Sequence, residues 1–181
     1  MKKTFTRFIL PVILPAFITM MSGCKQLDLT PGLPEETTEG KGTFGCRVNG
    51  EIWLPYAEHT LDNAIEPEYD SAGWFAVGAE REKSVGHYIW LQLADSTGLS
   101  TKTYSSNEGF AAHYKKMTNG QEEIFDTPVG SPASITITKI VPPSGSERHA
   151  IISGTFSFTA RSFTTGDSIR ITDGRFDLKA L

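Results

Sequence analysis

The sequence predicts an all-β fold, an antiparallel β-sandwich or barrel of about nine to ten short strands. Apolar and polar residues alternate with period two along most of the chain after residue 42, and a helical period is almost absent there. Turn-forming residues separate these segments about every 8–12 residues. The 181 residues are 39% hydrophobic and 21% charged, which is typical of a globular protein and not of a disordered or collagen-like chain.

The first two expected strands flank an Asn-Gly pair. Thr43–Val48 and Glu51–Leu54 are predicted to form a hairpin, because Asn49-Gly50 supplies the two positive-φ positions of a type I′ turn. Strands are expected next at Ala72–Glu80 and Val85–Ala94. Within the second of these, one face carries a row of period-two residues: Val85, His87, Ile89, Leu91 and Leu93. Its other face carries Tyr88 and Trp90, so we expect this strand to be central in its sheet or to underlie a site.

The remaining strands follow in the second half of the chain. Phe110–Met117 and Gln121–Phe125 flank another Asn-Gly pair, and Ala133–Val141 is rich in β-branched residues. Ile151–Ala160 sets a Phe/Ile face against a Ser/Thr face, as a half-buried antiparallel strand does. The last alternating segment begins at Ser168 and changes parity at Asp173-Gly174, which predicts a bulge or a tight turn.

The N-terminal segment, residues 1–23, is typical of a secretory signal peptide. A positively charged start with Lys2, Lys3 and Arg7 precedes the apolar stretch Phe8–Met21. As a helix that stretch would be about 21 Å long at ~1.5 Å per residue, short of the ~30 Å of a bilayer core. We therefore expect it to direct export and not to span a membrane.

The sequence Met21-Ser22-Gly23-Cys24 resembles the lipobox of bacterial lipoproteins. The resemblance implies that Cys24 is lipidated and becomes the first residue after cleavage, and two acyl chains suffice for stable anchoring. The alternative is an ordinary secretory signal with an incidental cysteine. Residues 24–41, rich in Pro, Gly and acidic residues, are expected to form a flexible tether, followed by a single β domain over 42–181.

Charge argues against nucleic acid as a partner. Removing residues 1–23 removes three cations, so the mature chain carries 14 − 21 = −7. Nucleic-acid binding depends on cationic contacts to phosphate, which an acidic chain supplies poorly. We expect the lipid at Cys24 to be what holds the protein to the membrane.

Both ends of the expected β domain resemble small Bacteroidetes lipoproteins assigned to a domain of unknown function. The residues that carry the resemblance are Thr43–Trp53 at the start, with Ile152–Thr159 and Ile171–Asp177 at the end. The resemblance implies a β architecture and a lipid-anchored place in the cell envelope, at the outer membrane, with either leaflet open. It implies no mechanism, and no functional residue is carried over.

Motifs of common cofactors are absent or out of context, so no cofactor is expected. Gly40–Gly45 reads G-x-G-x-x-G, but a tether precedes it and a strand follows, whereas a dinucleotide site needs a strand before and a helix after. Cys46 is expected to be a buried, inert thiol. His87 is expected to face the core, and His113 to lie on a solvated strand edge.

One acidic cluster merits weighing as a site. It lies in 58–71, a segment with no strand period, and comprises Asp62, Glu66, Glu68 and Asp70. Closely spaced carboxylates suit Ca²⁺, and two of them facing a cleft would suit a glycosidase. Like charges also occur in plain solvated loops. All three interpretations stay open from sequence.

The aromatic residues are the candidates for binding: Trp53, Trp74, Tyr88 and Trp90. Aromatic faces bind sugars and peptides, although the pattern around Tyr88 and Trp90 favours a central core strand. We predict a non-catalytic envelope lipoprotein that binds a glycan, peptide or protein. The alternatives are a glycan-acting hydrolase or a calcium-dependent binding module using the segment 58–71. A lipocalin-like carrier is disfavoured, because the early G-x-W pattern is missing from 49–53.

Lipidation is testable by one substitution. Cys24→Ser is expected to leave the protein unlipidated and soluble without detergent, because no other residue is predicted to carry the lipid. Detergent phase partitioning measures this, and a Cys24→Ser protein that still entered the detergent phase would contradict the anchor.

Overall fold

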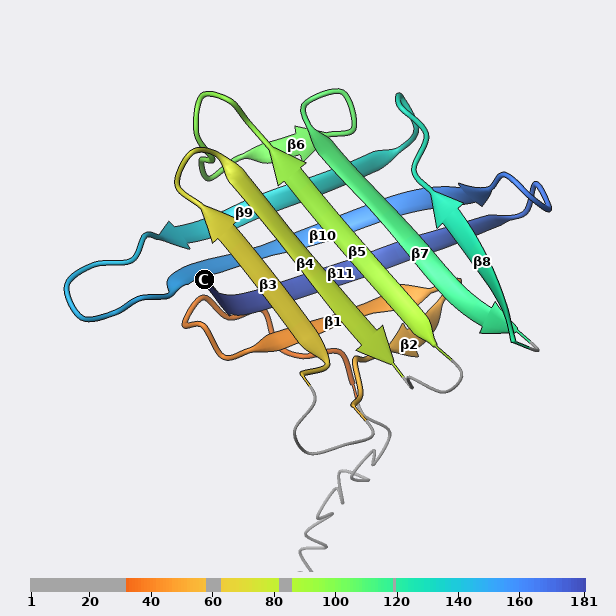
Figure 1. Cartoon of the computed structure of the whole chain (residues 1–181), viewed down its shortest axis with the longest axis horizontal. Coiled ribbons are helices and arrows are strands. Elements are labelled where there is room, and N and C mark those ends of the chain that lie inside the picture. The colour runs from red at the N-terminus through yellow and green to blue at the C-terminus, as the bar shows by residue number, and fades with distance from the viewer. Residues whose placement is uncertain (1–31, 58–62, 82–85, 119) are drawn as a thin grey trace, which may run out of the picture. The chain divides into compact units, whose positions relative to one another are not determined.

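The computed structural model describes residues 32–57, 63–81, 86–118 and 120–181, and it confirms the all-β prediction. Those residues hold eleven strands, all antiparallel where they pair, and no helix (Figure 1). The strands are β1 Thr43–Val48, β2 Glu51–Trp53, β3 Ile65–Asp70, β4 Trp74–Arg81, β5 His87–Ala94, β6 Thr103–Ser105, β7 Phe110–Thr118, β8 Gln121–Asp126, β9 Ala133–Val141, β10 Ala150–Ser162 and β11 Ser168–Ala180. The same residues contain no helix that is long and apolar enough to cross a membrane.

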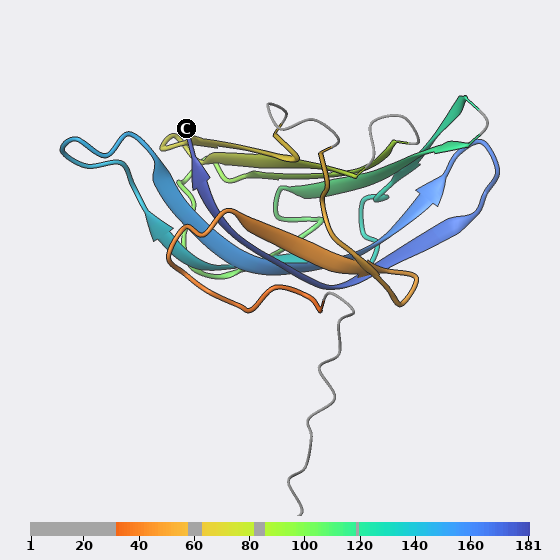
Figure 2. The ribbon, with the colours of Figure 1, turned by 90° about the horizontal axis from the view of Figure 1, so that it is seen from below.

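The strands form one continuous sheet that folds over into two layers (Figure 2). Its main path runs β2-β1-β11-β10-β8-β7-β5-β4-β3, with β9 beside β10 and β6 beside β9. The fold-over is the short β8–β10 pairing, Arg161 with Asp126 and Ser162 with Phe125. On the other side a single backbone hydrogen bond, 2.8 Å from the Tyr69 N–H to the Leu181 carbonyl, ties β3 to the C-terminus. The sheet is not closed into a barrel, so the sandwich is the correct alternative of the two.

The strand count exceeds the expected nine to ten because β3 and β6 were not predicted from the sequence. β3 lies inside 58–71, where a loop was expected, and it reads Ile-Glu-Pro-Glu-Tyr-Asp. Pro67 lacks an N–H, which an edge strand tolerates, and β3 is an edge strand. β6 has only three residues, too few for a period to be visible.

The predicted turn and bulge are both confirmed. Asn49 and Gly50 have φ values of 51° and 91°, as the type I′ hairpin requires. β11 continues through Asp173-Gly174 as a bulged strand, with Asp173 at a φ of 52° and a register shift against β10. A Cβ on Gly174 would lie 2.6 Å from the ring of Phe156, so only glycine fits there.

The core lies between the two layers and is built by the inward residues of each strand. Ile89, Leu91 and Leu93 of β5 are fully buried, as the alternation predicted. Phe75 and Phe176 stack across the layers, with ring centroids 5.4 Å apart. Cys46 is fully buried as expected, and burial raises the pKa of its thiol, so the unreactive thiol form dominates.

A buried carboxylate fastens the segment before β1 to the outer side of β10 and β11. Asp177 is 1% exposed and accepts side-chain hydrogen bonds from Thr37 at 2.6 Å and Ser153 at 2.7 Å. The backbone N–H groups of residues 39, 40 and 41 donate to it as well, at 2.7–3.2 Å. Residues 37–41, expected in the tether, are thus bonded to the β domain, and the compact unit begins at Gly32.

Removing this carboxylate should destabilise the fold. Asp177→Ala is expected to lower the free energy of unfolding by about 3 kcal/mol, because three N–H groups and two hydroxyls lose a charged acceptor. Urea denaturation measures the change. Asp167→Ala, at an exposed position, is the control and should change stability by less than about 0.5 kcal/mol.

The same group makes stability depend on pH. Burial alone would raise the pKa of Asp177, but its hydrogen bonds outweigh burial and hold the pKa well below the ordinary 3.8. A carboxyl with a lowered folded-state pKa stabilises fully above its unfolded value and loses that contribution as pH falls toward the folded one. The urea midpoint of the natural protein should therefore fall more steeply below about pH 4 than that of Asp177→Asn. Parallel curves would contradict this.

Candidate functional site

Three aromatic rings gather on the outer face of the layer formed by β3, β4, β5, β7 and β8. Tyr88 and Trp90 point outward from β5, and His113 lies directly opposite Trp90 on β7. The ring centroids are 6.3 Å apart for Tyr88–Trp90, 6.1 Å for Tyr88–His113 and 6.3 Å for Trp90–His113, with interplanar angles of 14–35°. Tyr88, Trp90 and His113 thus form an aromatic patch of three near-parallel, evenly spaced rings.

Small residues of β4 make room for the aromatic patch. Gly78 lies opposite Trp90, and Ala76 is the next outward residue of the same strand. A Cβ on Gly78 would collide with the Tyr88 hydroxyl and lie 3.0 Å from its Cζ, so the ring rests directly on the glycine backbone. Ala76 is fully buried although it faces away from the core, which shows that the outer side chains cover β4. The site therefore depends on small residues as much as on large ones.

Carboxylates border the aromatic patch on one side and a lysine on the other. Burial, with Glu66, Glu80 and Glu68 nearby, raises the pKa of Tyr88 to about 12, so the phenol stays protonated. The Lys115 ammonium lies 5.4 Å from the centroid of the Tyr88 ring, a cation–π contact. Hydrogen-bond donors and acceptors thus surround an apolar plane.

His113 is the member that sequence reasoning missed. It was expected on a solvated strand edge, but β7 is an interior strand between β5 and β8, and the imidazole is partly buried. Burial, assisted by Lys115 and opposed by Asp126, lowers the pKa of His113, so the neutral ring prevails at neutral pH. The pairing of Trp90 with His113 follows from the register of β5 against β7. The sequence does not reveal this register, because residues 95–109 separate the two strands.

The acidic candidates lie along β3 and not around a common point. Glu66, Glu68 and Asp70 are the exposed residues of this strand, each roughly 6.6 Å from the next along its axis. Asp62 lies outside the described residues. Among the residues that the structure does describe, no three His, Cys, Asp or Glu side chains are placed to hold a metal ion.

The aromatic candidates divide between the outer face and the core. Trp74 shares the outward parity of Ala76 and Gly78 on β4, but it lies opposite Ala94 at the far end of β5. Trp53 is 2% exposed and packs edge-on against Phe44 with centroids 6.2 Å apart, so it belongs to the core. The lipidation candidate Cys24 lies outside the described residues.

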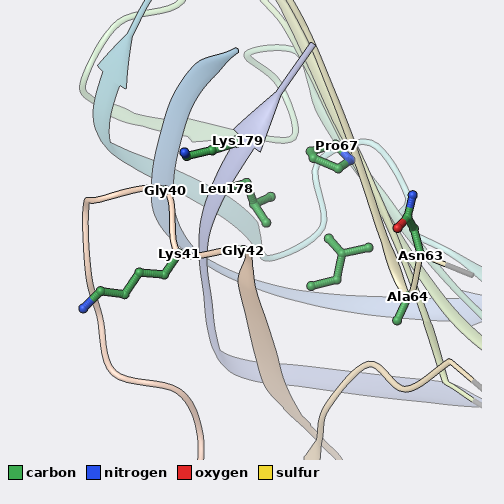
Figure 3. Close-up of a pocket in the computed structure, with 9 residues that line it drawn as sticks. Gly40, Lys41, Gly42, Asn63, Ala64, Pro67, Leu178 and Lys179 are labelled. Carbon is green, nitrogen blue, oxygen red and sulfur yellow. The ribbon is translucent and has the colours of Figure 1, made fainter. Parts of the chain in front are cut away.

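A cavity of about 440 Å³ lies between the segment before β1 and the edge strand β3 (Figure 3). Gly40 and Gly42 line one side and Pro67 the other, and the Lys41 side chain points away from it. The described residues of this lining include Lys41, Asn63 and Lys179 but no carboxylate or histidine that could pair with a lysine in acid–base chemistry. The aromatic patch remains the stronger candidate.

Comparison with known proteins adds no relative: no protein-family model, curated protein sequence or solved structure matches this chain. The resemblance of the domain ends to Bacteroidetes lipoproteins therefore stays a prediction.

The dependence of the site on Gly78 is testable by a double-mutant cycle. Gly78→Ala is expected to cost about 1–3 kcal/mol of unfolding free energy, because the new methyl group forces the Tyr88 ring off the sheet. In a Tyr88→Ala background the same change should cost much less, since no ring is left to displace. Urea denaturation of the four proteins measures the coupling, and an equal cost in both backgrounds would show that Tyr88 does not rest on Gly78.

Proposed function

We propose that this protein is an envelope lipoprotein whose β domain binds a glycan on the aromatic patch without catalysing a reaction. The observation that carries the proposal is the set of three near-parallel rings on a face turned away from the core. Core rings elsewhere in the sandwich pack between the layers, where they stabilise the fold. Tyr88, Trp90 and His113 lie outside that packing.

The chemistry of the patch favours a sugar over other ligands. A sugar ring has an apolar C–H face that can lie on an aromatic plane and a rim of hydroxyls that need partners. Here the carboxylates of Glu66 and Glu68 can accept from hydroxyls, and Lys115 and the outward Gln92 can donate to them. Such convergent polar groups around an apolar plane are the usual composition of a small-ligand site.

The lipoprotein part of the proposal rests on the sequence before residue 32. The charged start, the apolar stretch and Cys24 in a lipobox-like context support export and lipidation. A lipid at Cys24 would hold the domain at the envelope, where glycans are accessible. The hydrolase alternative would use Glu66 and Glu68, which lie on an edge strand and are not among the residues that line the neighbouring cavity between β3 and the segment before β1.

Binding is tested by screening the full chain in detergent on a glycan array and measuring the best glycan by calorimetry. Trp90→Ala and Tyr88→Ala are each expected to weaken affinity by about tenfold or more, because each removes about 1–3 kcal/mol of ring contact.

Phe163→Ala is the matched control for this experiment. Phe163 is 79% exposed in the β10–β11 connection, so it is an accessible aromatic residue outside the patch, and its loss should leave affinity unchanged. Equal losses in all three variants would contradict the proposal. If the protein releases free sugar from the bound glycan, and Glu66→Gln or Glu68→Gln abolishes that release, the protein is a hydrolase and the binding-only proposal is wrong.

A further inference from the structure

A second cavity, distinct from the aromatic patch, opens at the end of the sandwich where the β1–β2 hairpin meets the end of β4 and the start of β5. Its volume is about 300 Å³. Trp53, Arg81, His87 and Tyr114 line it, and these residues come from four different strands. Arg81 and His87 belong to the inward parity of β4 and β5, so the cavity lies on the opposite face of these strands from Tyr88 and Trp90.

The side chains of this cavity are mostly hydrogen-bond donors. Arg81 carries a fixed positive charge and forms no ion pair with any residue in the described part of the chain. The Tyr114 hydroxyl lies 3.0 Å from His87 Nδ1, and burial raises the pKa of this phenol to about 12, so it keeps its proton. Among the described residues of the lining, Glu51 at the exposed rim is the one carboxylate.

One buried donor in the wall has no acceptor. Trp53 is 2% exposed, and its indole Nε1–H is out of reach of solvent and unpaired among the described residues. Leaving such a donor unsatisfied costs about 1–3 kcal/mol, and natural folds rarely tolerate that cost without a reason. A ligand oxygen that enters beside the indole ring, with a small adjustment of the rim, would supply the missing acceptor.

We propose that this cavity binds a small oxyanion, a carboxylate or phosphate group held by Arg81 and the Trp53 indole N–H. The guanidinium matches the paired oxygens of either group, and a charge-assisted hydrogen bond is roughly twice as strong as a neutral one. A cavity of about 300 Å³ admits a group of this size and the first atoms of the molecule that bears it. The site is independent of the aromatic patch and does not depend on glycan binding.

The indole N–H signals of the three tryptophans report on this site directly by ¹H–¹⁵N NMR. The full chain in detergent micelles is titrated with sodium acetate in one series and inorganic phosphate in another, against sodium chloride at equal ionic strength. The Trp53 signal, assigned as the one lost in Trp53→Phe, is expected to move downfield and saturate. Saturation by acetate alone identifies a carboxylate site, and saturation by phosphate alone identifies a phosphate site.

Two arginine variants complete the test. Arg81→Gln should weaken the titration about 10- to 100-fold, the effect of losing a charged hydrogen bond, while the Trp74 and Trp90 signals show that the fold persists. Arg148→Gln removes an exposed cation from the β9–β10 connection and should leave the titration unchanged. A Trp53 signal that moves no further with acetate or phosphate than with chloride would overturn the proposal, as would equal weakening by both arginine variants.

Discussion

The layer formed by β1, β2, β9, β10 and β11 depends on the hydrogen bonds made by the buried Asp177 carboxylate. A charge that is 1% exposed is tolerable only when it is fully hydrogen-bonded. Asp177 lies on β11, and its donors come from the segment before β1 and from β10. Those segments must therefore meet at one point. This meeting point places Thr43, the first residue of β1, opposite Asp177 and so sets the register of β1 against β11.

The layer formed by β3, β4, β5, β7 and β8 depends on a different constraint. Its strands β4 and β5 contribute both to the core and to the outer face. The inward residues of β5 fill the core, and its outward residues build the aromatic patch. The large outward rings of β5 fit only because the outward residues of the neighbouring strand β4 are small. These residues are Ala76 and Gly78. The same strands end in Arg81 and begin in His87, so core, patch and donor-lined cavity share one pair of strands.

Sequence patterns predicted those parts of the fold that local chemistry determines. The Asn49-Gly50 hairpin, the strand Ala133–Val141 and the bulge at Asp173 agree with the structure. β3 was hidden because Pro67 and alternating acids do not resemble a strand, although both suit an edge. The contact of Trp90 with His113 and the hydrogen bonds from residues 37–41 to Asp177 join residues distant in sequence, and the pattern of a single sequence does not reveal such contacts.

We propose that a glycan binds on the outer face of β5 and β7, against the aromatic patch that the fold leaves outside its core. The measurement that tests it most directly is a crystal structure of the full chain with the tightest glycan from the array. We expect a sugar ring lying over Tyr88, Trp90 and His113, with its hydroxyls toward Glu66 and Lys115. A glycan bound only on the Ser/Thr face of β9 and β10, or inserted between the layers, would contradict it.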